Sequence, residues 1–356
     1  MSQRHSPKEL DHRPRVSVVV PCYNYGHYLT GAVNSVLDQA DVDADVLIID
    51  DASPDGSGEV ASEMAAADPR IRVIRHDTNK GHIATYNEGL EIVEGDYIVL
   101  LSADDMLTPG SLGRATALME CHPSVGLVYG FPVEFLDVAP PAATAVRSWT
   151  VWSGQEWIEA RCQRAHNVVN CPEVVMRGSV QRAIGGYDPA LPHSGDLEMW
   201  LRAAAVSDVG RVNGSAQAYY RIHPNSMQRT VYAGHLTDLE GRLLAFESVL
   251  LGSEPALPNG AHLDQQVRRA LAASALDWVV WAYDERRTAD EPIDDYIEFA
   301  QRVYPNTDRL REWRTLTHIR RVGPERAAKG LPVAGRKVIR DLNHRIRWRR
   351  WRRSGV

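Results

Sequence analysis

Two adjacent carboxylates stand at the end of an apolar run. In VLLSADDMLTP, which spans residues 99–109, the run stops at Ser102 and is followed by Asp104 and Asp105. Adjacent acids repel each other, and burial makes that repulsion more costly. The pair therefore predicts a positive partner, and a divalent cation that bridges phosphate oxygens is one such partner. The alternative is that the two acids only stabilise the N-terminus of the following helix, because negative charges interact favourably with the helix dipole there.

A third acid, Asp51, ends another apolar run, DVLIIDD (45–51). A carboxylate at this place could accept hydrogen bonds from a nucleotide base or from ribose hydroxyls. The alternative is a turn-forming aspartate, because the following stretch, DDASPDG (50–56), is rich in turn residues. The pattern alone leaves both interpretations open.

Apolar runs alternate with helical patterns between residues 15 and 130. The expected strands are 15–21, 45–51, 70–76, 96–105 and 125–130, and the expected helices are 28–39, 58–67 and 84–95. Several strands are continuous Val/Ile/Leu runs, which is typical of a parallel sheet covered by helices on both faces. Ligands bind beyond the carboxyl ends of such strands. We therefore expect Asp50, Asp51, Asp104 and Asp105 to surround one cleft.

The chain becomes less regular after residue 130 and turns helical after Tyr232. Two long amphipathic patterns occupy residues 235–251 and 264–287. The expected parts are a flexible N-terminal tail (1–14), an α/β domain (15–232), a helical C-terminal domain (233–335) and a basic Arg/Trp-rich tail (336–356).

The composition is that of a globular protein, with 356 residues, 44% of them hydrophobic and 24% charged. No apolar run approaches the length that spans a bilayer, and the N-terminus lacks the apolar core of a secretory signal, so we expect a cytoplasmic protein. The four cysteines, at 22, 121, 162 and 171, show no metal-ligand spacing and are expected to be reduced and structural.

The charge is unevenly distributed. The net charge is −6, yet residues 336–356 contain nine Lys/Arg and one Asp, so the tail carries +8 and the rest of the chain −14. Tryptophans among arginines in RIRWRRWRR (345–353) favour contact with an anionic membrane surface, and the alternative is a solvated chain end. The acidic body argues against a nucleic-acid partner.

Four blocks, in order, resemble the family 2 glycosyltransferases, which are inverting enzymes with the nucleotide-diphospho-sugar transferase (GT-A) fold. They are VSVVVPCYNYGHYLTGAVNSVLDQ, VLIIDDASPDGS, NKGHIATYNEGLEIVEGDYIVLLSADDMLTP and the later GGYDPALPHSGDLEMWLRAA (185–204). The similarity runs from about Arg15 to Gln228. It implies that residues 15–232 are a GT-A domain, with a mostly parallel sheet between helices and an α-helical region after it.

The resemblance also implies roles for individual residues. It implies nucleotide-sugar contacts for Pro21, Tyr23, Asn24, Asp51, Lys80, Gly81 and Asp104, with Asp51 recognising the base. It implies metal ligation by Asp105, within the block that matches the family's Asp-X-Asp motif, and by His223 in YYRIHPNSMQ (219–228). At the position of the first acid of that motif, this chain has Ser102.

The acceptor-side block of the family usually carries Glu-Asp before a helix, where this chain has Gly195 and Asp196. The resemblance makes Asp196 the general base that takes the proton of the acceptor hydroxyl. The alternative is a helix-capping aspartate. Where many relatives carry Ala-Arg-Asn, the chain has Thr85, Tyr86 and Asn87.

The function implied is transfer of one sugar from a UDP-, dTDP- or GDP-sugar to a hydroxyl of a glycan or lipid-linked saccharide, with Mn²⁺ or Mg²⁺ as cofactor. Cell-envelope polysaccharide, glycolipid or other glycoconjugate synthesis at the inner face of the membrane would suit such an enzyme. The Gln-X-X-Arg-Trp motif of processive synthases is absent, which favours single additions. The alternatives are a sugar-phosphate nucleotidyltransferase and a non-catalytic binding protein on a degenerate transferase domain.

Three tryptophans, Trp149, Trp152 and Trp157, precede the acceptor-side block. Sugar rings stack on aromatic faces, but tryptophan is more often a large core residue, and we favour the core.

Overall fold

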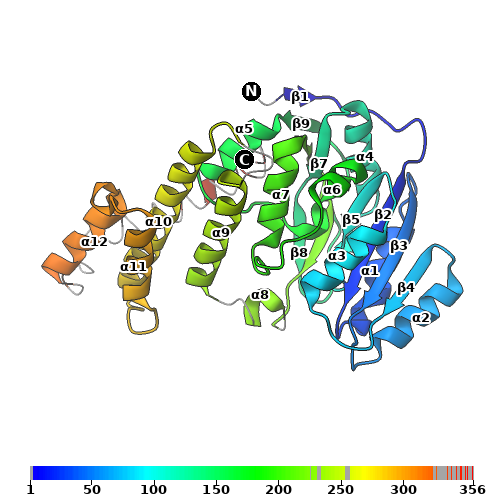
Figure 1. Ribbon diagram of the computed structural model, residues 1–356, viewed down its shortest axis with the longest axis horizontal. Helices are drawn as coiled ribbons and strands as arrows, with labels where there is room; N and C mark the ends of the chain where they lie inside the picture. The colour runs from blue at the N-terminus through cyan, green and yellow to red at the C-terminus, as the bar shows by residue number, and fades with distance from the viewer. Residues whose placement is uncertain are drawn as a thin grey trace. The chain divides into compact units, whose positions relative to one another are not determined.

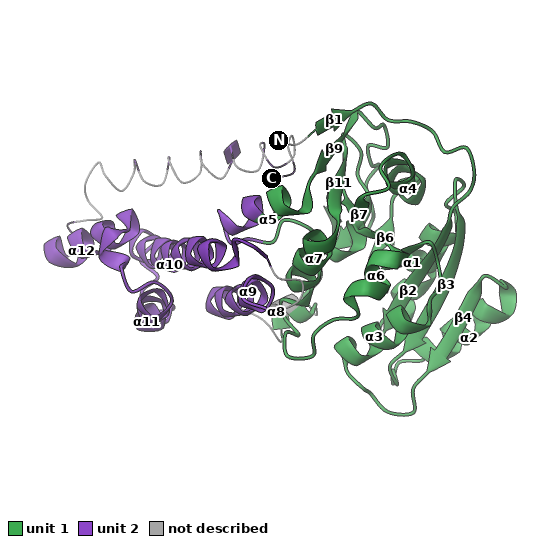
Figure 2. Cartoon of the chain, turned by 45° about the horizontal axis from the view of Figure 1, so that its top comes forward, with its two compact units in different colours: residues 1–158, 167–231 green, residues 159–166, 232–356 purple. Residues whose placement is uncertain are grey.

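The computed structural model describes residues 3–224, 226–230, 234–252 and 257–323, together with isolated positions from 326 onward. The chain divides into two compact units, shown in Figure 2. Unit 1 comprises residues 1–158 and 167–231, and unit 2 comprises residues 159–166 and 232–356. The division at 231/232 lies one residue before the expected boundary, and residues 159–166 belong to unit 2, although the sequence predicted them in the α/β domain.

A nine-stranded sheet forms the centre of unit 1 (Figure 1), in the order β1-β9-β11-β7-β10-β5-β2-β3-β4. Its strands are β1 (Gln3–His5), β2 (Arg15–Cys22), β3 (Asp43–Asp50), β4 (Ile71–Arg75), β5 (Tyr97–Leu100), β7 (Val125–Tyr129), β9 (Ser148–Trp152), β10 (Val175–Arg177) and β11 (Asp208–Asn213). Strands β5, β2, β3 and β4 are parallel, as the apolar runs predicted. Strand β10 runs antiparallel to both β5 and β7, so the whole sheet is mixed.

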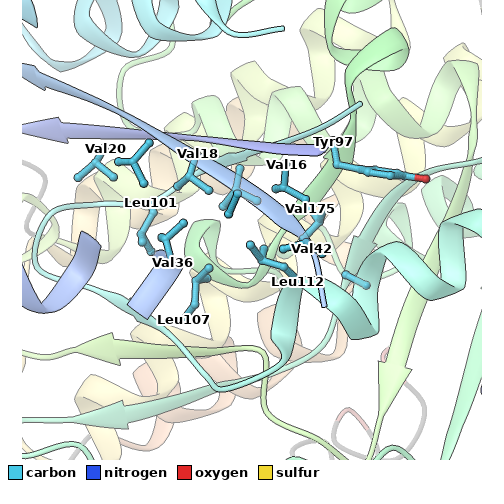
Figure 3. Packing of buried hydrophobic residues seen from close by; sticks show 14 of the residues in the cluster. Val16, Val18, Val20, Val36, Val42, Tyr97, Leu101, Leu107, Leu112 and Val175 are labelled. Carbon is cyan, nitrogen blue, oxygen red and sulfur yellow. The ribbon is translucent and has the colours of Figure 1, made fainter. Parts of the chain in front are cut away.

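Three of the parallel strands, β2, β3 and β5, are buried on both faces, whereas the edge strand β4 is partly exposed. The helices that follow them in the chain are α1 (Gly26–Leu37), α2 (Ser57–Ala67), α3 (His82–Ile92) and α4 (Ser111–Cys121). Val16, Val18 and Val20 of β2 pack with Val36 of α1 and Leu112 of α4 in one apolar cluster (Figure 3). Each fully buried valine side chain stabilises the fold by about 1.5 kcal/mol or more.

The opposite face of β2 packs against α3. A Cβ atom at Gly89 of α3 would lie only 2.3 Å from Val19 Cγ1, so the glycine allows the helix to approach the sheet closely. This double burial explains why β2 has no alternation of apolar and polar residues.

Strand β5 is shorter than the strand predicted over 96–105, because it ends at Leu100. The chain then turns, and the backbone N–H of Asp105 donates to the carbonyl of Ser102 at 3.0 Å. Asp104 and Asp105 therefore lie in a turn beyond the strand.

A small second sheet continues from that turn. It has the order β6-β12-β8 and consists of β6 (Met106–Leu107), β12 (Ala218–Arg221) and β8 (Pro132–Phe135). Strand β6 follows Asp105 directly and pairs antiparallel with β12. This pairing brings residues after position 218 to the acidic turn.

Unit 1 also contains several short helices. They are α5 (Gly154–Cys162), which continues into unit 2, η1 (Cys171–Glu173), α6 (Gly178–Ile184), α7 (Gly195–Val206) and α8 (Met227–Thr230). Trp149, Trp152 and Trp157 are 1%, 5% and 0% exposed, which confirms that they are core residues. All four cysteines are free thiols, as expected.

Part of the segment predicted as a flexible tail (1–14) forms a strand. Residues 3–5 form β1, which pairs antiparallel with β9 from Gln3 opposite Val151 to His5 opposite Trp149. The hydrogen bonds of an edge strand stabilise these residues, and such pairing leaves no apolar signal in a three-residue sequence.

Unit 2 is helical, as predicted. Its helices are α9 (His235–Leu250), α10 (Gly260–Asp284), α11 (Ile293–Val303), η2 (Thr307–Arg309) and α12 (Arg311–Val322). Among the described residues, none of the helices combines the length and the apolar character needed to cross a bilayer. The predicted basic tail (336–356) lies outside the described residues, apart from isolated positions.

Candidate active site

The acidic turn after β5 is tied to the end of β12. Asp105 is 2% exposed, and its Oδ1 accepts a hydrogen bond of 2.8 Å from the backbone N–H of Arg221. The Arg221 Nε donates to the carbonyl oxygen of Asp104 at 2.9 Å. The guanidinium of Arg221 also lies over the rings of Tyr28 and Phe135, with its Cζ 4.2 Å and 4.3 Å from their centroids. An arginine is therefore one positive group beside the two acids.

Asp105 lies in an environment that disfavours its ionised form. Burial raises the pKa of Asp105 well above its usual range, and the neighbouring charge of Asp104 raises it further. The backbone N–H and the charge of Arg221 lower the pKa, but they do not offset the burial. A cation bound at this place would neutralise the repulsion between the two carboxylates.

His223 contacts Asp104. Its Nε2 lies 2.9 Å from Asp104 Oδ2, and its ring lies at 85° to the ring of Tyr25, with 5.5 Å between their centroids. The sequence predicted that His223 and Asp105 would together ligate a metal, whereas the direct partner of the imidazole is Asp104. Within the described ranges no three His, Cys, Asp or Glu side chains already converge as a metal site.

The donor atoms present nevertheless fit a divalent cation. Asp104 and Asp105 supply carboxylate oxygens, which Mn²⁺ and Mg²⁺ prefer, and His223 adds an imidazole nitrogen in contact with one of them. The burial of Asp105 beside the like-charged Asp104 is the feature that favours a cation here.

Asp51 follows the end of β3 and is 3% exposed. Its Oδ1 accepts hydrogen bonds from the backbone N–H of Lys80 at 2.8 Å, and its Oδ2 accepts one from Gly81 at 3.0 Å. The Nδ1 of His76 lies 2.7 Å from the same Oδ1. Burial alone would raise the pKa of Asp51, but the hydrogen bonds from His76, Lys80 and Gly81 outweigh it and lower the pKa.

The residues predicted to bind nucleotide beside Asp51 form its immediate surroundings. Lys80 and Gly81 contribute backbone N–H groups, and the Lys80 Nζ pairs with Glu88 Oε2 at 2.8 Å. Gly81 has φ 86°, which a residue with a side chain rarely adopts. The chain at 80–81 therefore turns tightly around the Asp51 carboxylate.

The sequence analysis missed His76 and Glu88. The buried His76 ring bridges Asp51 and Glu88, with its Nε2 3.0 Å from Glu88 Oε2. His76 comes directly after β4, so the same rule that selected Asp51, a polar residue at the carboxyl end of a strand, could have found it.

Pro21 lies near the end of β2, and Tyr23 and Asn24 lie in the turn that follows it. Tyr23 is 46% exposed, whereas the Oδ1 of Asn24 is buried and accepts no hydrogen bond from the described residues. Asn24 has φ 62°, and its backbone N–H donates to Ser53 Oγ at 3.0 Å. An orphaned buried oxygen in this turn is available to a ligand that donates a hydrogen bond.

Asp196 lies in the first turn of α7. The Tyr187 hydroxyl donates to its Oδ1 at 2.9 Å. Burial raises the pKa of Asp196, while the hydrogen bond from Tyr187 and the charge of His82 act in the opposite direction. A raised pKa suits a carboxylate that has to accept a proton near neutral pH.

Asp196 and the acidic turn act electrostatically on two common neighbours. Burial raises the pKa of the Tyr220 phenol, and the charges of Asp105, Asp104 and Asp196 raise it further. The charges of Asp196 and Asp105 likewise raise the pKa of the buried Cys171 thiol, after the larger effect of burial. Two side chains thus lie within electrostatic reach of both acidic groups.

Part of the chain matches a known protein family. Residues 17–169 match the family model described as Glycosyl transferase family 2. These residues are a family 2 glycosyltransferase domain. The uncharacterized glycosyltransferase EpsJ of Bacillus subtilis is 36% identical over 222 residues, which cover 62% of this chain and 64% of EpsJ. The chain therefore spans less than two thirds of this relative's length.

Solved structures identify the fold as GT-A. S. aureus TarS (residues 1–349), in complex with UDP-GlcNAc, superposes with a TM-score of 0.59 at 18% identity and covers 83% of each chain. The mannosyltransferase PcManGT from Pyrobaculum calidifontis, in complex with GDP-Man and Mn²⁺, gives a TM-score of 0.50 at 15% identity, covering 83% of this chain and 88% of that one. At these identities the likeness concerns the fold.

Proposed function

We propose that the chain is an inverting, metal-dependent glycosyltransferase that moves one sugar from a nucleoside diphosphate sugar to an acceptor hydroxyl. The observation that carries the proposal is the pair of adjacent carboxylates beyond β5, the buried Asp105 and the partly buried Asp104, with the His223 imidazole on Asp104. A non-catalytic module has no need to keep two like charges together in a buried turn, since they destabilise it.

Binding of the nucleotide is assigned to the turns after β2 and β3. The unsatisfied Oδ1 of Asn24 can accept a hydrogen bond, and Tyr23 offers an exposed aromatic face on which a base can stack. Asp51 either recognises the base directly or organises the turn at residues 80–81 that contacts the base. The backbone N–H groups of Lys80 and Gly81 donate hydrogen bonds to the Asp51 carboxylate. UDP-sugars and GDP-sugars are both candidates, as TarS and PcManGT are described with donors of these two kinds.

The transfer step is assigned to Asp196. As the acceptor oxygen forms a bond to the anomeric carbon, its proton passes to the Asp196 carboxylate, and the bond to the diphosphate breaks with its electron pair on the leaving oxygen. A single displacement of this kind inverts the anomeric centre. The raised pKa of Asp196 supports its role as the base.

Asp104, Asp105 and His223 are assigned to a divalent cation, Mn²⁺ or Mg²⁺. The chemistry that this cation supplies when bound is stabilisation of the negative charge on the departing nucleoside diphosphate. Arg221, which is fixed on the same turn by its hydrogen bond to the Asp104 carbonyl, adds a permanent positive charge.

The acceptor and the location in the cell stay predictions from the sequence. The predicted acceptor is a hydroxyl of a glycan or lipid-linked saccharide. The predicted role is envelope polysaccharide synthesis, with the basic tail attached to the inner face of the membrane.

The experiment that tests the proposal is turnover of a panel of UDP-, dTDP- and GDP-sugars, measured as release of nucleoside diphosphate with Mn²⁺, with Mg²⁺ and with EDTA. We expect release from at least one donor, dependent on a metal and lost in Asp105→Ala. Release of pyrophosphate from sugar 1-phosphate and nucleoside triphosphate would instead identify a nucleotidyltransferase. Failure to bind any donor under all metal conditions would indicate a degenerate domain.

A further inference from the structure

The hydroxyl of Tyr187 is the side-chain donor that holds Asp196. It lies 2.9 Å from Asp196 Oδ1, and the Tyr187 side chain is buried, with 3% of the residue exposed. Within the described part of the chain, no other side chain donates a hydrogen bond to the Asp196 carboxylate. Asp196 Oδ2 therefore accepts no hydrogen bond from the described residues.

The backbone of Tyr187 is fixed by Asn87 of α3. The Tyr187 N–H donates to Asn87 Oδ1 at 2.6 Å, and Asn87 Nδ2 donates to the Tyr187 carbonyl at 2.8 Å. Gly186 makes this close approach possible, because a Cβ atom at that position would lie 2.3 Å from Asn87 Oδ1. Two hydrogen bonds to one peptide segment restrain it as a bidentate clamp.

The ring of Tyr187 fits against Gly195. A Cβ atom at Gly195 would lie 2.8 Å from Tyr187 Cδ1, so a glutamate at the position would collide with the ring. The Tyr86 ring packs edge-on to Tyr187, with 5.5 Å between the centroids and 66° between the planes. The glycine that departs from the family's Glu-Asp pair thus provides the space for the tyrosine.

We propose that Tyr187 is a positioning residue for the general base: its hydroxyl occupies Asp196 Oδ1 and leaves Oδ2 to accept the proton of the acceptor. Asn87, Gly186 and Gly195 hold the tyrosine in the required place. The inference rests on the proposed function, in which Asp196 is the base. It also gives Gly195 and Asn87 a role, because Gly195 leaves space for the Tyr187 ring and Asn87 holds the Tyr187 backbone.

The protonation of Asp196 depends on the groups that face it. They are His82 and Tyr86 of α3, Cys171 of η1, Tyr220 of β12, and Tyr187 itself. Of these, Tyr187 and His82 lower the pKa of Asp196, against the larger effect of burial. Loss of the Tyr187 hydroxyl would consequently raise that pKa and leave the carboxylate less often ionised at neutral pH.

The test is the Tyr187→Phe variant, which keeps the ring and removes the hydroxyl. We expect kcat to fall roughly 10- to 100-fold, as for loss of a hydrogen bond to a charged group, with little change in KM for the donor. The acid limb of the pH profile of kcat should move to higher pH. A purely structural role would lower the melting temperature without moving that limb.

The matched control is Tyr97→Phe, which removes another buried tyrosine hydroxyl, the one that donates to Glu120 at 2.5 Å. It should leave the acid limb where it is. A Tyr187→Phe enzyme with the wild-type pH profile and kcat would overturn this inference alone. Absence of transfer by the wild-type protein, or transfer retained by Asp196→Asn, would overturn the proposed function and this inference with it.

Discussion

The Nε2 of His223 lies 2.9 Å from the Oδ2 of Asp104, although the two residues are 119 positions apart in the chain. The contact depends on the small sheet, in which β6 follows the acidic turn and pairs with β12, two residues before His223. Two segments that lie far apart in the sequence are thus brought into contact.

This contact predicts that His223 contributes to metal affinity. We expect His223→Gln to raise the Mn²⁺ concentration required for half-maximal turnover by roughly 10- to 100-fold, since loss of a ligand or of its orienting partner weakens binding to that extent. The measurement is nucleoside diphosphate release over a Mn²⁺ titration. His262→Gln, in unit 2, is the control and should resemble wild type. An unchanged Mn²⁺ requirement in His223→Gln would show that His223 does not contribute to metal binding.

The raised pKa of Asp105 predicts that its charge destabilises the metal-free protein. Its folded-state pKa lies above its unfolded value, so the favourable contribution is complete below the unfolded pKa and is lost as the pH rises through the folded pKa. At pH 7 without metal, Asp105→Asn should raise Tm by roughly 2–4 °C, equivalent to about 1 kcal/mol. Turnover should be lost in the same variant.

The comparison variant for this melt is Asp77→Asn, at an exposed position. It should leave Tm unchanged. A lower Tm for metal-free Asp105→Asn would mean that the Asp105 carboxylate stabilises the fold and is not kept for a ligand.

Glu173 makes a pH-dependent contribution to the stability of the fold, and no role in the reaction is proposed for it. Burial raises its pKa to about 8, while hydrogen bonds from the backbone of Asn170 and Gly130 and the charge of Arg211 lower it. The pKa of Glu173 is higher in the folded than in the unfolded protein, so its contribution to the free energy of unfolding is complete below about pH 4.5. That contribution is lost as the pH rises through about 8. Glu173→Gln should flatten the fall of the free energy of unfolding over this window in urea titrations. A slope identical to wild type would contradict the assignment.

His76 is predicted to support nucleotide binding through Asp51. Loss of its contact in His76→Asn should raise the Kd for the nucleoside diphosphate of the active donor by about 10-fold, which corresponds to one hydrogen bond to a carboxylate. Calorimetry with Asp51→Asn in parallel should show a loss at least as large. Wild-type affinity in His76→Asn would reduce the histidine to a packing role.

The places of several candidate residues after strand ends could be predicted from the sequence. Asp51, Asp104 and Asp105 end uninterrupted apolar runs, and the topology of a parallel sheet brings such ends together. The contacts that depend on irregular segments could not be predicted. Nothing in the spacing of Tyr187 indicates that its hydroxyl reaches Asp196, or that Gly195 leaves space for its ring.

The fold was likewise predictable in its regular half. The Val/Ile/Leu runs gave β2, β3 and β4 within two residues at each end. Strands β1, β6 and β10 contain three residues or fewer and depend on partners far away in the chain, so local patterns contain no signal for them.

The central claim is tested most directly by the rate of sugar transfer in Asp196→Asn, measured together with the affinity for the donor. The account predicts that transfer falls by at least about 100-fold, because the substituted amide cannot accept the acceptor's proton, while donor affinity stays near the wild-type value. Transfer at the wild-type rate would show that Asp196 is not the base. A loss of donor affinity equal to the loss of transfer would show that Asp196 supports the fold of the site and takes no part in the reaction.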